Sequence, residues 1–371
     1  MNILITGATG FLGGHLADAC LREGHRVRAL VRPGSDTARL KTLGPGLDLV
    51  PGDLADTASL AHAAMGCDTV LHSAARVVDY GSRAQFEETN VTGTQRLLTA
   101  ARAAGATRIV FVSSPSALMH LREGDRLRID ESTPHPTRFF NHYCATKAAA
   151  EQYVLSANTP DFTTCALRPR GIWGPRDHAG FLPRMIASMR AGRLPDLSGG
   201  KRVRVSLCHV DNAVDACLRA TTVPAERIGG KAYFVADREE TDLWAFLTRI
   251  GALLGCPPPH PRVPAAATRI LAEAVEAAWR LRPSAGTGPP LSRYMAALLT
   301  RSATYDTGAA RRDLGYDPPR AQEDGVSGLL RWIHDIGGAD AWARPPASRP
   351  DSPQSPDPHA STRTDQGTTP R

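Results

Sequence analysis

The chain has 371 residues, of which 42% are hydrophobic, with a formal net charge of +7 and a pI near 9.2. This composition is typical of a globular protein with one large domain or two ordinary ones. No basic run interleaves with aromatic residues, so we expect no nucleic-acid partner, and no segment reaches about 18 consecutive apolar residues, which argues against a transmembrane helix. Seven cysteines without a CxxC pair argue against a disulfide framework or a zinc site. The first residues lack the features of a secretory signal, and we expect a cytoplasmic protein.

Short apolar runs alternate with helix-length segments through the first half of the chain. The runs lie at 2–6, 26–31, 47–50, 69–74, 108–114 and 162–168, and the helical segments at 11–23, 36–43, 57–65, 84–104 and 143–157. Buried strands separated by helices are typical of βαβ units. This pattern predicts an α/β fold with a doubly wound, Rossmann-type parallel sheet.

The second half is less regular, and we expect a smaller, mainly helical substrate-binding domain there. A further strand is predicted at 231–237, a helix at 241–254, and an amphipathic helix at 262–281. The apolar side of that last helix carries Ile270, Leu271, Ala274, Val275 and Ala278. We expect this helix to cap the second domain; a lid or a membrane-surface helix is the alternative.

These patterns predict three parts of the chain. We assign residues 1–168, with a returning segment near 203–237, to a dinucleotide-binding domain, and residues 169–202 and 238–344 to the substrate-binding domain. Residues 345–371 contain no aromatic residue and no aliphatic residue larger than alanine. Such a segment cannot bury enough apolar surface to offset its ordering entropy, so we expect a disordered tail.

Three glycines, Gly7, Gly10 and Gly13, stand between the first predicted strand and the first predicted helix. They permit a tight turn, a close approach of a pyrophosphate to the backbone, and close packing of helix on strand. The spacing is GxxGxxG, which differs from the better-known GxGxxG fingerprint. The context of strand, glycines and helix predicts a dinucleotide site.

The end of the second predicted strand bears on the choice of dinucleotide. Leu30, Val31 and Arg32 stand there, and no carboxylate is present to bind the ribose hydroxyls. An arginine at this place can accommodate a 2′-phosphate, so NADPH is favoured over NADH. Arg32 as a solvated loop cation is the alternative. Asp53, at the end of the third strand, either faces the adenine or caps a helix.

Tyr143 and Lys147 are four residues apart, so on a helix they project from one face. Lys147 is one of only four lysines among 44 basic residues. A neighbouring ammonium favours the phenolate form of a tyrosine, and we expect it to bring the pKa of Tyr143 towards neutral values. A compact ammonium also suits the ribose hydroxyls of a nicotinamide. Hydroxyls at Ser113, Ser114 and Ser116 end a strand about thirty residues upstream, so the three residue types can surround one carbonyl.

At this point the chain resembles the extended short-chain dehydrogenase/reductases. The matching elements are GATGFLG at 7–13, GDL at 52–54, HSAA at 72–75, NVTGT at 90–94, VSSPS at 112–116, YCATK at 143–147 and LRPRGIWGP at 167–175. The resemblance covers about residues 1–335. It implies that Ser114 orients the substrate oxygen, that Tyr143 transfers the proton, and that Lys147 holds the ribose, with Asn90 near the active site; Ser113 and Ser116 are alternatives for the serine. It also implies a cofactor site made of Gly7, Thr9, Gly10, Phe11, Leu12, Gly13, Arg32, Asp53, Leu54, Ser73, Ala74, Ala75, Tyr143 and Lys147.

Within that family the chain looks most like the 3β-hydroxysteroid dehydrogenase-like branch, and in particular like the 2-alkyl-3-oxoalkanoate reductases of bacterial olefin and β-lactone biosynthesis. This resemblance implies an NADPH-dependent ketoreductase acting on an apolar ketone or keto acid. Trp173, Phe181, Leu182, Met185 and Ile186 are candidates for an apolar slot, and Arg168, Arg170, Arg176 or Arg184 for binding a carboxylate.

Three alternatives remain at this stage: a hydroxysteroid dehydrogenase, a nucleotide-sugar epimerase, and a non-catalytic dinucleotide sensor. A homodimer, and peripheral association with a membrane or a biosynthetic complex, are compatible with the sequence.

Overall fold

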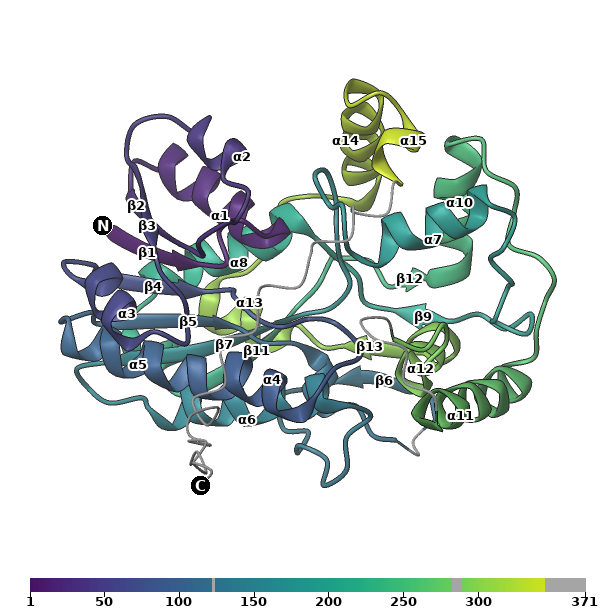
Figure 1. Cartoon of the computed structure of the whole chain (residues 1–371), viewed down its shortest axis with the longest axis horizontal. Coiled ribbons are helices and arrows are strands. Elements are labelled where there is room, and N and C mark those ends of the chain that lie inside the picture. Colours follow the sequence, from purple (N-terminus) through teal and green to yellow (C-terminus); the bar gives the residue numbers. More distant parts are fainter. Residues whose placement is uncertain (122–123, 282–287, 344–371) are drawn as a thin grey trace, which may run out of the picture.

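The computed structural model describes residues 1–121, 124–281 and 288–343 of the chain. One lobe is a parallel sheet flanked by helices, and the other is mainly helical (Figure 1). The segment 345–371, for which the sequence predicts disorder, lies outside the described residues.

Seven parallel strands form the central sheet, in the order β11-β7-β5-β4-β1-β2-β3. Their bounds are β1 Asn2–Thr6, β2 Arg26–Val31, β3 Leu47–Pro51, β4 Thr69–His72, β5 Arg108–Val112, β7 Thr163–Pro169 and β11 Lys231–Val235. The central strands β1, β4, β5 and β7 are buried along almost their whole length, as predicted for a sheet covered on both faces. The strand order reverses between β1 and β4, and in open α/β sheets ligands bind at the carboxyl ends of the strands where the order reverses.

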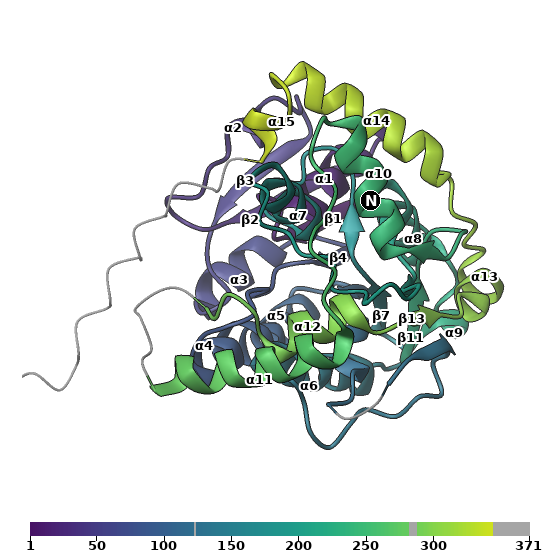
Figure 2. The same cartoon turned by 90° about the vertical axis from the view of Figure 1, so that its right-hand side faces the viewer.

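Helices cover both faces of this sheet (Figures 1 and 2). One face carries α1 Phe11–Arg22 and α8 Val210–Thr222, and the other carries α3 Thr57–Ala64, α5 Gly93–Ala103 and α6 His142–Ser156. The short helices of this lobe are α2 Ala38–Lys41, α9 Ala225–Ile228, α13 Gly308–Leu314 and the 3-10 turn η2 Pro115–Leu118. The doubly wound arrangement predicted from the sequence is confirmed.

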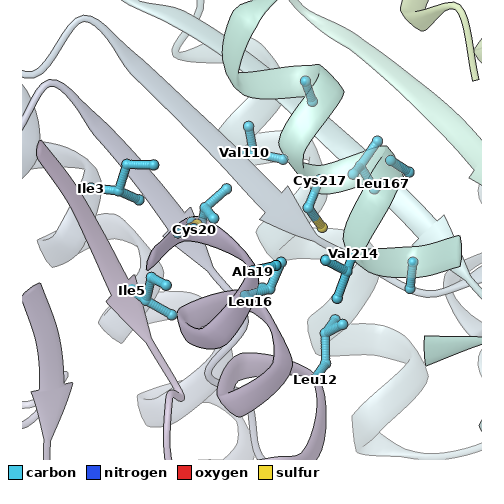
Figure 3. Packing of buried hydrophobic residues seen from close by; sticks show 14 of the residues in the cluster. Ile3, Ile5, Leu12, Leu16, Ala19, Cys20, Val110, Leu167, Val214 and Cys217 are labelled. Atoms are coloured by element: carbon cyan, nitrogen blue, oxygen red, sulfur yellow. The ribbon is translucent and has the colours of Figure 1, made fainter. Parts of the chain in front are cut away.

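The layer between the sheet and helices α1 and α8 is built from aliphatic and cysteine side chains (Figure 3). Leu16 and Cys20 of α1 and Val214 and Cys217 of α8 are all buried in it. Full burial of a side chain such as Leu16 stabilises the fold by about 1.5–3 kcal/mol. This packing fixes the start of α1 against the carboxyl end of β1.

All seven cysteines of the chain are free and buried. They are spread over the molecule, with Cys165 in β7 on the α1 side of the sheet, Cys67 on the opposite side, and Cys256 in the second lobe. Desolvation raises the pKa of these thiols, to about 12 for Cys20 and Cys165.

The helix predicted at 84–104 is interrupted. Residues Arg83–Phe86 form α4, Glu87–Thr92 form a π-helical turn, and α5 follows from Gly93. A Cβ at Gly93 would lie 2.8 Å from Cβ of Leu54, so glycine lets the helix pass close to the loop after β3. The π-helical turn places the buried Asn90 against α6, which is a typical use of such turns at functional sites.

The second lobe has a core of its own around Trp173, Leu247 and Leu329. Its helices are α7 Phe181–Arg190, α10 Leu243–Leu253, α11 Ala265–Leu281, α12 Arg293–Thr300, α14 Gln322–Asp335 and α15 Ala339–Trp342. Its strands are β6 Arg126–Ile129, β8 Ile172–Trp173, β9 Arg204–Val205, β10 Cys208–His209, β12 Thr241–Asp242 and β13 Ala303–Tyr305. Four of them form a small sheet in the order β12-β9-β13-β6.

Several elements cross between the lobes, among them β9 of the returning segment 203–237, which pairs with β12 and β13 of the second lobe. Strand β6 belongs to the segment 1–168, yet it pairs with β13 of the second lobe. Helix α13 belongs to the segment 238–344, yet Ala310 and Leu314 pack into the core beneath the main sheet. The chain therefore ties the lobes together through contacts remote in sequence.

Helix α11 is present as predicted and packs beside α12 of the second lobe, but it does so by another side than the apolar one named from the sequence. Ile270 and Leu271 are 70% and 53% exposed, whereas Thr268, Ala272 and Glu276 are buried. The inner side is held by Glu276, whose carboxylate pairs with Arg293 at 3.0 Å. Within the described residues, no helix is long and apolar enough to cross a bilayer.

Candidate active site

Three glycines shape the turn between β1 and α1. Gly7 has a φ of +75°, a conformation that favours glycine, and its carbonyl accepts a hydrogen bond from the Gly10 N–H at 2.9 Å. A Cβ at Gly13 would lie 2.1 Å from the Gly7 oxygen, so glycine is needed for α1 to pack this closely on β1. Among the described residues none caps the N-terminus of α1 with its side chain, and the first turn carries no acid. The backbone N–H groups there fit the pyrophosphate of a dinucleotide.

The loop after β4 lies directly against the glycine turn. A Cβ at Gly7 would lie 2.8 Å from the Ala74 nitrogen, and the Ser73 hydroxyl donates to the Thr6 carbonyl at 2.8 Å. The carboxyl ends of β1 and β4 thus bring together the predicted residues Gly7, Thr9, Gly10, Phe11, Leu12, Gly13, Ser73, Ala74 and Ala75.

The ends of β2 and β3 carry the other predicted cofactor residues. Arg32 follows β2 and is exposed. The carboxylate of Asp53, after β3, accepts a hydrogen bond from the Ala55 N–H at 2.9 Å. The cap of α3 is Asp56, whose carboxylate accepts from the Ala58 N–H at 3.0 Å, so the interpretation of Asp53 as a helix cap is wrong.

Arg39 is a second cation at this end of the sheet, and it was missed from the sequence. From α2 its guanidinium donates to the Gly14 carbonyl at 3.2 Å, beside the first turns of α1. Desolvation and the charge of Arg176 lower the pKa of Arg39. In a chain with 44 basic residues its spacing carried no signal.

Ser114 and Tyr143 meet where β5 ends and α6 begins. The Ser114 oxygen accepts a hydrogen bond from the Ser116 N–H at 3.2 Å, as the cap of η2. Because this contact uses an oxygen lone pair, the hydroxyl proton of Ser114 can be donated elsewhere. Desolvation raises the pKa of Tyr143 to about 12, and a side-chain hydrogen bond with Ser114 opposes that rise. The pair can therefore share one oxygen acceptor.

Lys147 lies one helical turn after Tyr143, as predicted, but its ammonium does not act on the phenol. Its Nζ donates to the Val112 carbonyl at 2.6 Å and lies 4.1 Å from the centre of the Phe111 ring. Burial lowers the pKa of Lys147 to about 7, partly offset by Glu151. The expected lowering of the Tyr143 pKa is wrong for this structure, since desolvation of the phenol dominates.

A buried ion pair holds the next turn of α6. Arg168 of β7 donates to both carboxylate oxygens of Glu151, at 2.6 and 2.9 Å, and His135 contacts the same carboxylate at 3.0 Å. Burial alone would raise the pKa of Glu151, but the hydrogen bonds from Arg168 and His135 outweigh it and lower that pKa to about 2. Arg168 was a candidate for binding a substrate carboxylate, and the structure assigns it to this pair instead.

Asn90 supports α6 and has no contact with the Tyr143 phenol among its hydrogen bonds. Its side chain binds both backbone groups of Arg76, at 2.7 and 3.2 Å, and donates to the Thr146 hydroxyl at 3.0 Å. It thereby ties the loop after β4 to the turn between Tyr143 and Lys147. We propose that Asn90 is a positioning residue.

The second lobe contributes a tyrosine to this site that sequence reasoning missed. Tyr294 of α12 shares a hydrogen bond with the Ser116 hydroxyl at 2.7 Å. Its ring also lies edge-on to that of Tyr143, with ring centres 6.5 Å apart. Ser116 is thus engaged by Tyr294, and Ser113 is buried beside Glu151. Ser114 is the serine best placed to face a substrate.

Asp79 links the same helices through their first turns. Its carboxylate accepts from the Asn141 side chain at 2.6 Å and from the Ser292 hydroxyl. Asn141 and Ser292 are the N-caps of α6 and α12. Desolvation raises the pKa of Asp79 despite these hydrogen bonds.

Most of the residues predicted to contact the substrate are buried in the core or bonded within the protein. Trp173, Leu182 and Ile186 are at most 1% exposed in the core of the second lobe, so they line no slot, whereas Phe181 and Met185 are half-buried at its edge. The remaining arginine candidates are bonded elsewhere: Arg170 to the Ala303 carbonyl, Arg176 to Asp18, and Arg184 to the Ala179 carbonyl. The position of an arginine in the sequence does not show whether its side chain donates to a backbone carbonyl or binds a ligand.

Comparison with known proteins identifies the family. The model of the 3-beta hydroxysteroid dehydrogenase/isomerase family matches residues 4–264. The chain belongs to this family. Its relatives there are NAD(P)-dependent oxidoreductases with the same extended short-chain fold, and this chain is an oxidoreductase of that type.

Three relatives cover most of the chain. A 4-hydroxy-2-methyl-3-oxo-4-farnesyl-3,4-dihydroquinoline-1-oxide ketoreductase of Stigmatella aurantiaca is 39% identical over 89% of this chain and 96% of its own. A 2-alkyl-3-oxoalkanoate reductase of Stenotrophomonas maltophilia is 36% identical over 89% and 98%. A 3-beta-hydroxysteroid dehydrogenase of Mycolicibacterium neoaurum is 31% identical over 90% and 92%.

Solved structures share the fold. The crystal structure of gox2253 superimposes with a TM-score of 0.73 at 28% identity, covering 90% of this chain and 98% of that one. A UDP-glucose 4-epimerase of Thermotoga maritima gives a TM-score of 0.68 at 19% identity, covering 91% and 99%. The likeness to the epimerase concerns the fold alone.

Proposed function

We propose that the protein is an NADPH-dependent ketoreductase that reduces the β-keto group of a long-chain 2-alkyl-3-oxoalkanoate to the β-hydroxy acid. The observation that carries the proposal is the side-chain hydrogen bond between Ser114, which follows β5, and Tyr143, in the first turn of α6. Two relatives that are 36% and 39% identical are named as a 2-alkyl-3-oxoalkanoate reductase and a ketoreductase, which supports this substrate class.

The roles follow from the protonation states of the side chains. A pKa of about 12 keeps the Tyr143 phenol protonated at neutral pH, the form required of a proton donor in reduction. The Ser114 hydroxyl donates to the same ketone oxygen and stabilises the negative charge that develops on it. When bound, the nicotinamide supplies the hydride to the ketone carbon, and the phenol proton completes the alcohol. In this proposal Lys147, one helical turn after Tyr143, binds the ribose hydroxyls of the nicotinamide.

The parts of the chain divide accordingly in our proposal. Residues 1–168 and the returning segment 203–237 bind the dinucleotide, and residues 169–202 and 238–344 bind the substrate. Neighbours of the same fold include structures solved with NAD, which supports a nicotinamide dinucleotide.

A substrate panel tests the function. The purified protein is incubated with NADPH and, in separate reactions, with 2-alkyl-3-oxoalkanoates, 3-ketosteroids and a UDP-sugar, and NADPH oxidation and products are measured. We expect turnover of the oxoalkanoates. Turnover of steroids alone would assign the second candidate, a 3β-hydroxysteroid dehydrogenase, which the family model and the 31% identical relative favour.

A single substitution tests the cofactor preference. Arg32→Ala is expected to raise the KM for NADPH about tenfold and to leave that for NADH unchanged, because a charge-assisted contact with the 2′-phosphate is lost. Arg26→Ala, exposed at the other end of β2, is the matched control. Equal effects of Arg32→Ala on both cofactors would refute the assignment.

A further inference from the structure

Ser116 lies between a tyrosine of the second lobe and the serine that contacts the ketone in the proposed reaction. Its hydroxyl shares a hydrogen bond of 2.7 Å with the Tyr294 hydroxyl of α12. Its backbone N–H donates to the Ser114 oxygen at 3.2 Å. Ser114 in turn shares a side-chain hydrogen bond with Tyr143. The second lobe is therefore connected to Ser114 and Tyr143 through one residue of η2.

The turn that carries Ser116 is short. It is a 3-10 turn of four residues, held by hydrogen bonds from the Ala117 N–H to the Ser114 carbonyl at 3.1 Å and from the Met119 N–H to the Ser116 carbonyl at 3.3 Å. Hydrogen bonds in 3-10 turns have poorer geometry than those in α-helices, so a contact from outside helps to fix such a turn. While the Ser116 N–H occupies a lone pair of the Ser114 oxygen, the hydroxyl proton of Ser114 can be donated to a ketone.

The hydroxyl of Tyr294 is not required for packing. The ring packs against an apolar cluster that contains Phe140 and Cys144, with the ring centres of Tyr294 and Phe140 6.1 Å apart. A phenylalanine ring would fill the same space. The hydroxyl instead reaches a buried position, where a polar group needs a hydrogen-bond partner, and Ser116 at 7% exposure supplies it. The polar contact therefore has a role apart from the apolar core.

A buried carboxylate holds α12 next to α6. Asp79 accepts hydrogen bonds from the Asn141 side chain at 2.6 Å and from the Ser292 hydroxyl. Asn141 and Ser292 also cap α6 and α12, each by accepting a hydrogen bond of 3.0 Å from the first turn of its helix. Tyr143 and Tyr294 each follow their cap by two residues, and their rings meet edge-on with centres 6.5 Å apart. Asp79 thus fixes the starts of both helices and, with them, the two tyrosines.

We propose that Tyr294 is a positioning residue through which the second lobe completes the active site. Its hydroxyl holds Ser116 so that the Ser116 N–H directs the Ser114 hydroxyl towards the ketone, and the contacts of Asp79 keep α12 close enough for this. The inference rests on the proposed reductase function, in which Ser114 donates to the ketone oxygen. It follows that displacement of α12 from α6 would slow the reaction without any change of side chain at Tyr143.

Tyr294→Phe tests the hydroxyl and keeps the ring. We expect kcat to fall about tenfold with KM and the Kd for NADPH unchanged, because a misdirected donor costs less than a lost one, for which about 100-fold or more is typical. The control is Tyr316→Phe: Tyr316 is 1% exposed in the core beneath the main sheet, and its hydroxyl donates to the Ala236 carbonyl, also at 2.7 Å. Both variants should lower the melting temperature by similar amounts, but only Tyr294→Phe should lower kcat. An unchanged kcat in Tyr294→Phe would overturn the proposal.

A double-mutant cycle distinguishes positioning of Ser114 from a general loosening of the site. If Tyr294 acts through Ser114, Tyr294→Phe should lower kcat about tenfold in the wild type but less than twofold in Ser114→Ala. Ser116→Ala should also lower kcat about tenfold, and its combination with Tyr294→Phe should cost no more. With an active wild type, additive losses would overturn this inference alone. A wild type inactive on every ketone of the panel would overturn the reductase function and this inference together.

Asp79→Asn tests the link between the two helices. The amide replaces one of the two acceptor oxygens by a donor, so the contact with either Asn141 or Ser292 is lost. We expect kcat to fall about fivefold in the wild type and less than twofold in the Tyr294→Phe background. A fivefold loss in that background as well would show that Asp79 acts without Tyr294 and would refute the link.

Discussion

Helices α6 and α11 have similar lengths, 15 and 17 residues, and depart from the usual surface pattern in opposite senses. Helix α6 buries Lys147 and Glu151, whereas α11 exposes Ile270 and Leu281. In α6 the buried charges are satisfied by Arg168, His135 and the Val112 carbonyl. In α11 the exposed apolar groups have no such compensation within the described residues. The first departure is compensated by hydrogen bonds within the protein, and the second is not compensated by the described residues.

The largest effect is expected at the phenol of α6. Tyr143→Phe removes the proton donor, and kcat should fall about a thousandfold while the Kd for NADPH changes little. Tyr153→Phe is the control, because Tyr153 lies on the same helix with 48% exposure. Steady-state kinetics and a fluorescence titration measure the two quantities. Retained turnover in Tyr143→Phe would refute the role of Tyr143 as proton donor.

The next effect concerns the buried amine. Lys147→Arg keeps the positive charge but places a larger, planar group where Nζ lies 4.1 Å from the Phe111 ring, so kcat should fall about a hundredfold. Lys41→Arg, exposed at the end of α2, should leave kcat unchanged. Near-normal kinetics of Lys147→Arg would mean that charge alone suffices at this position.

Removing the arginine beneath α6 should affect stability. Arg168→Leu leaves Glu151 buried without its main partner, and the free energy of unfolding at pH 7 should fall by about 3 kcal/mol. The pKa of Glu151 is lowered from 4.5 to about 2, so the pair contributes stability that is fully present above pH 4.5 and lost as the pH falls towards 2. The gap between variant and wild type should narrow over that range in urea denaturation. Arg170→Leu, which loses a bond to the Ala303 carbonyl, is the control, and an equal loss there would argue against the buried pair.

The smallest effect should come from α11. Leu271→Asp is expected to change the free energy of unfolding by less than about 0.5 kcal/mol and to leave kcat on a water-soluble ketone unchanged, because the side chain packs against little. Thermal unfolding and kinetics in lipid-free buffer measure this. A loss of more than about 2 kcal/mol would show that the exposed apolar side of α11 contributes to the fold and would remove the contrast with α6.

Much of the first lobe could be predicted from local patterns. Buried strands are nearly continuous apolar runs, so β1 to β5 and β7 could be predicted from residue types. The three glycines after β1 indicated the turn between β1 and α1 for the same reason, because their residue type permits its backbone conformation. The YxxxK spacing placed Tyr143 and Lys147 on one face because helical geometry does so regardless of context.

The second lobe could be predicted less well, since its arrangement depends on partners remote in sequence. Helical periodicity located α11 but could not show that Glu276 would meet Arg293 and turn the apolar side outward. Tyr294 lies 151 positions after Tyr143 in the numbering, so no motif connects them. Arg168 looked like a ligand-binding residue because its partner, Glu151, carries no motif of its own.

The seven buried thiols can be used to measure local opening of the folded protein. Alkylating reagents need access to the sulfur and a thiolate. In the folded state burial blocks the access, and the raised pKa keeps the thiols protonated. Each cysteine therefore reacts only when its layer opens. The labelling rate at Cys256 would report the opening of the second lobe, and that at Cys165 the opening of the sheet, so the relative stability of the two lobes can be measured without any substrate.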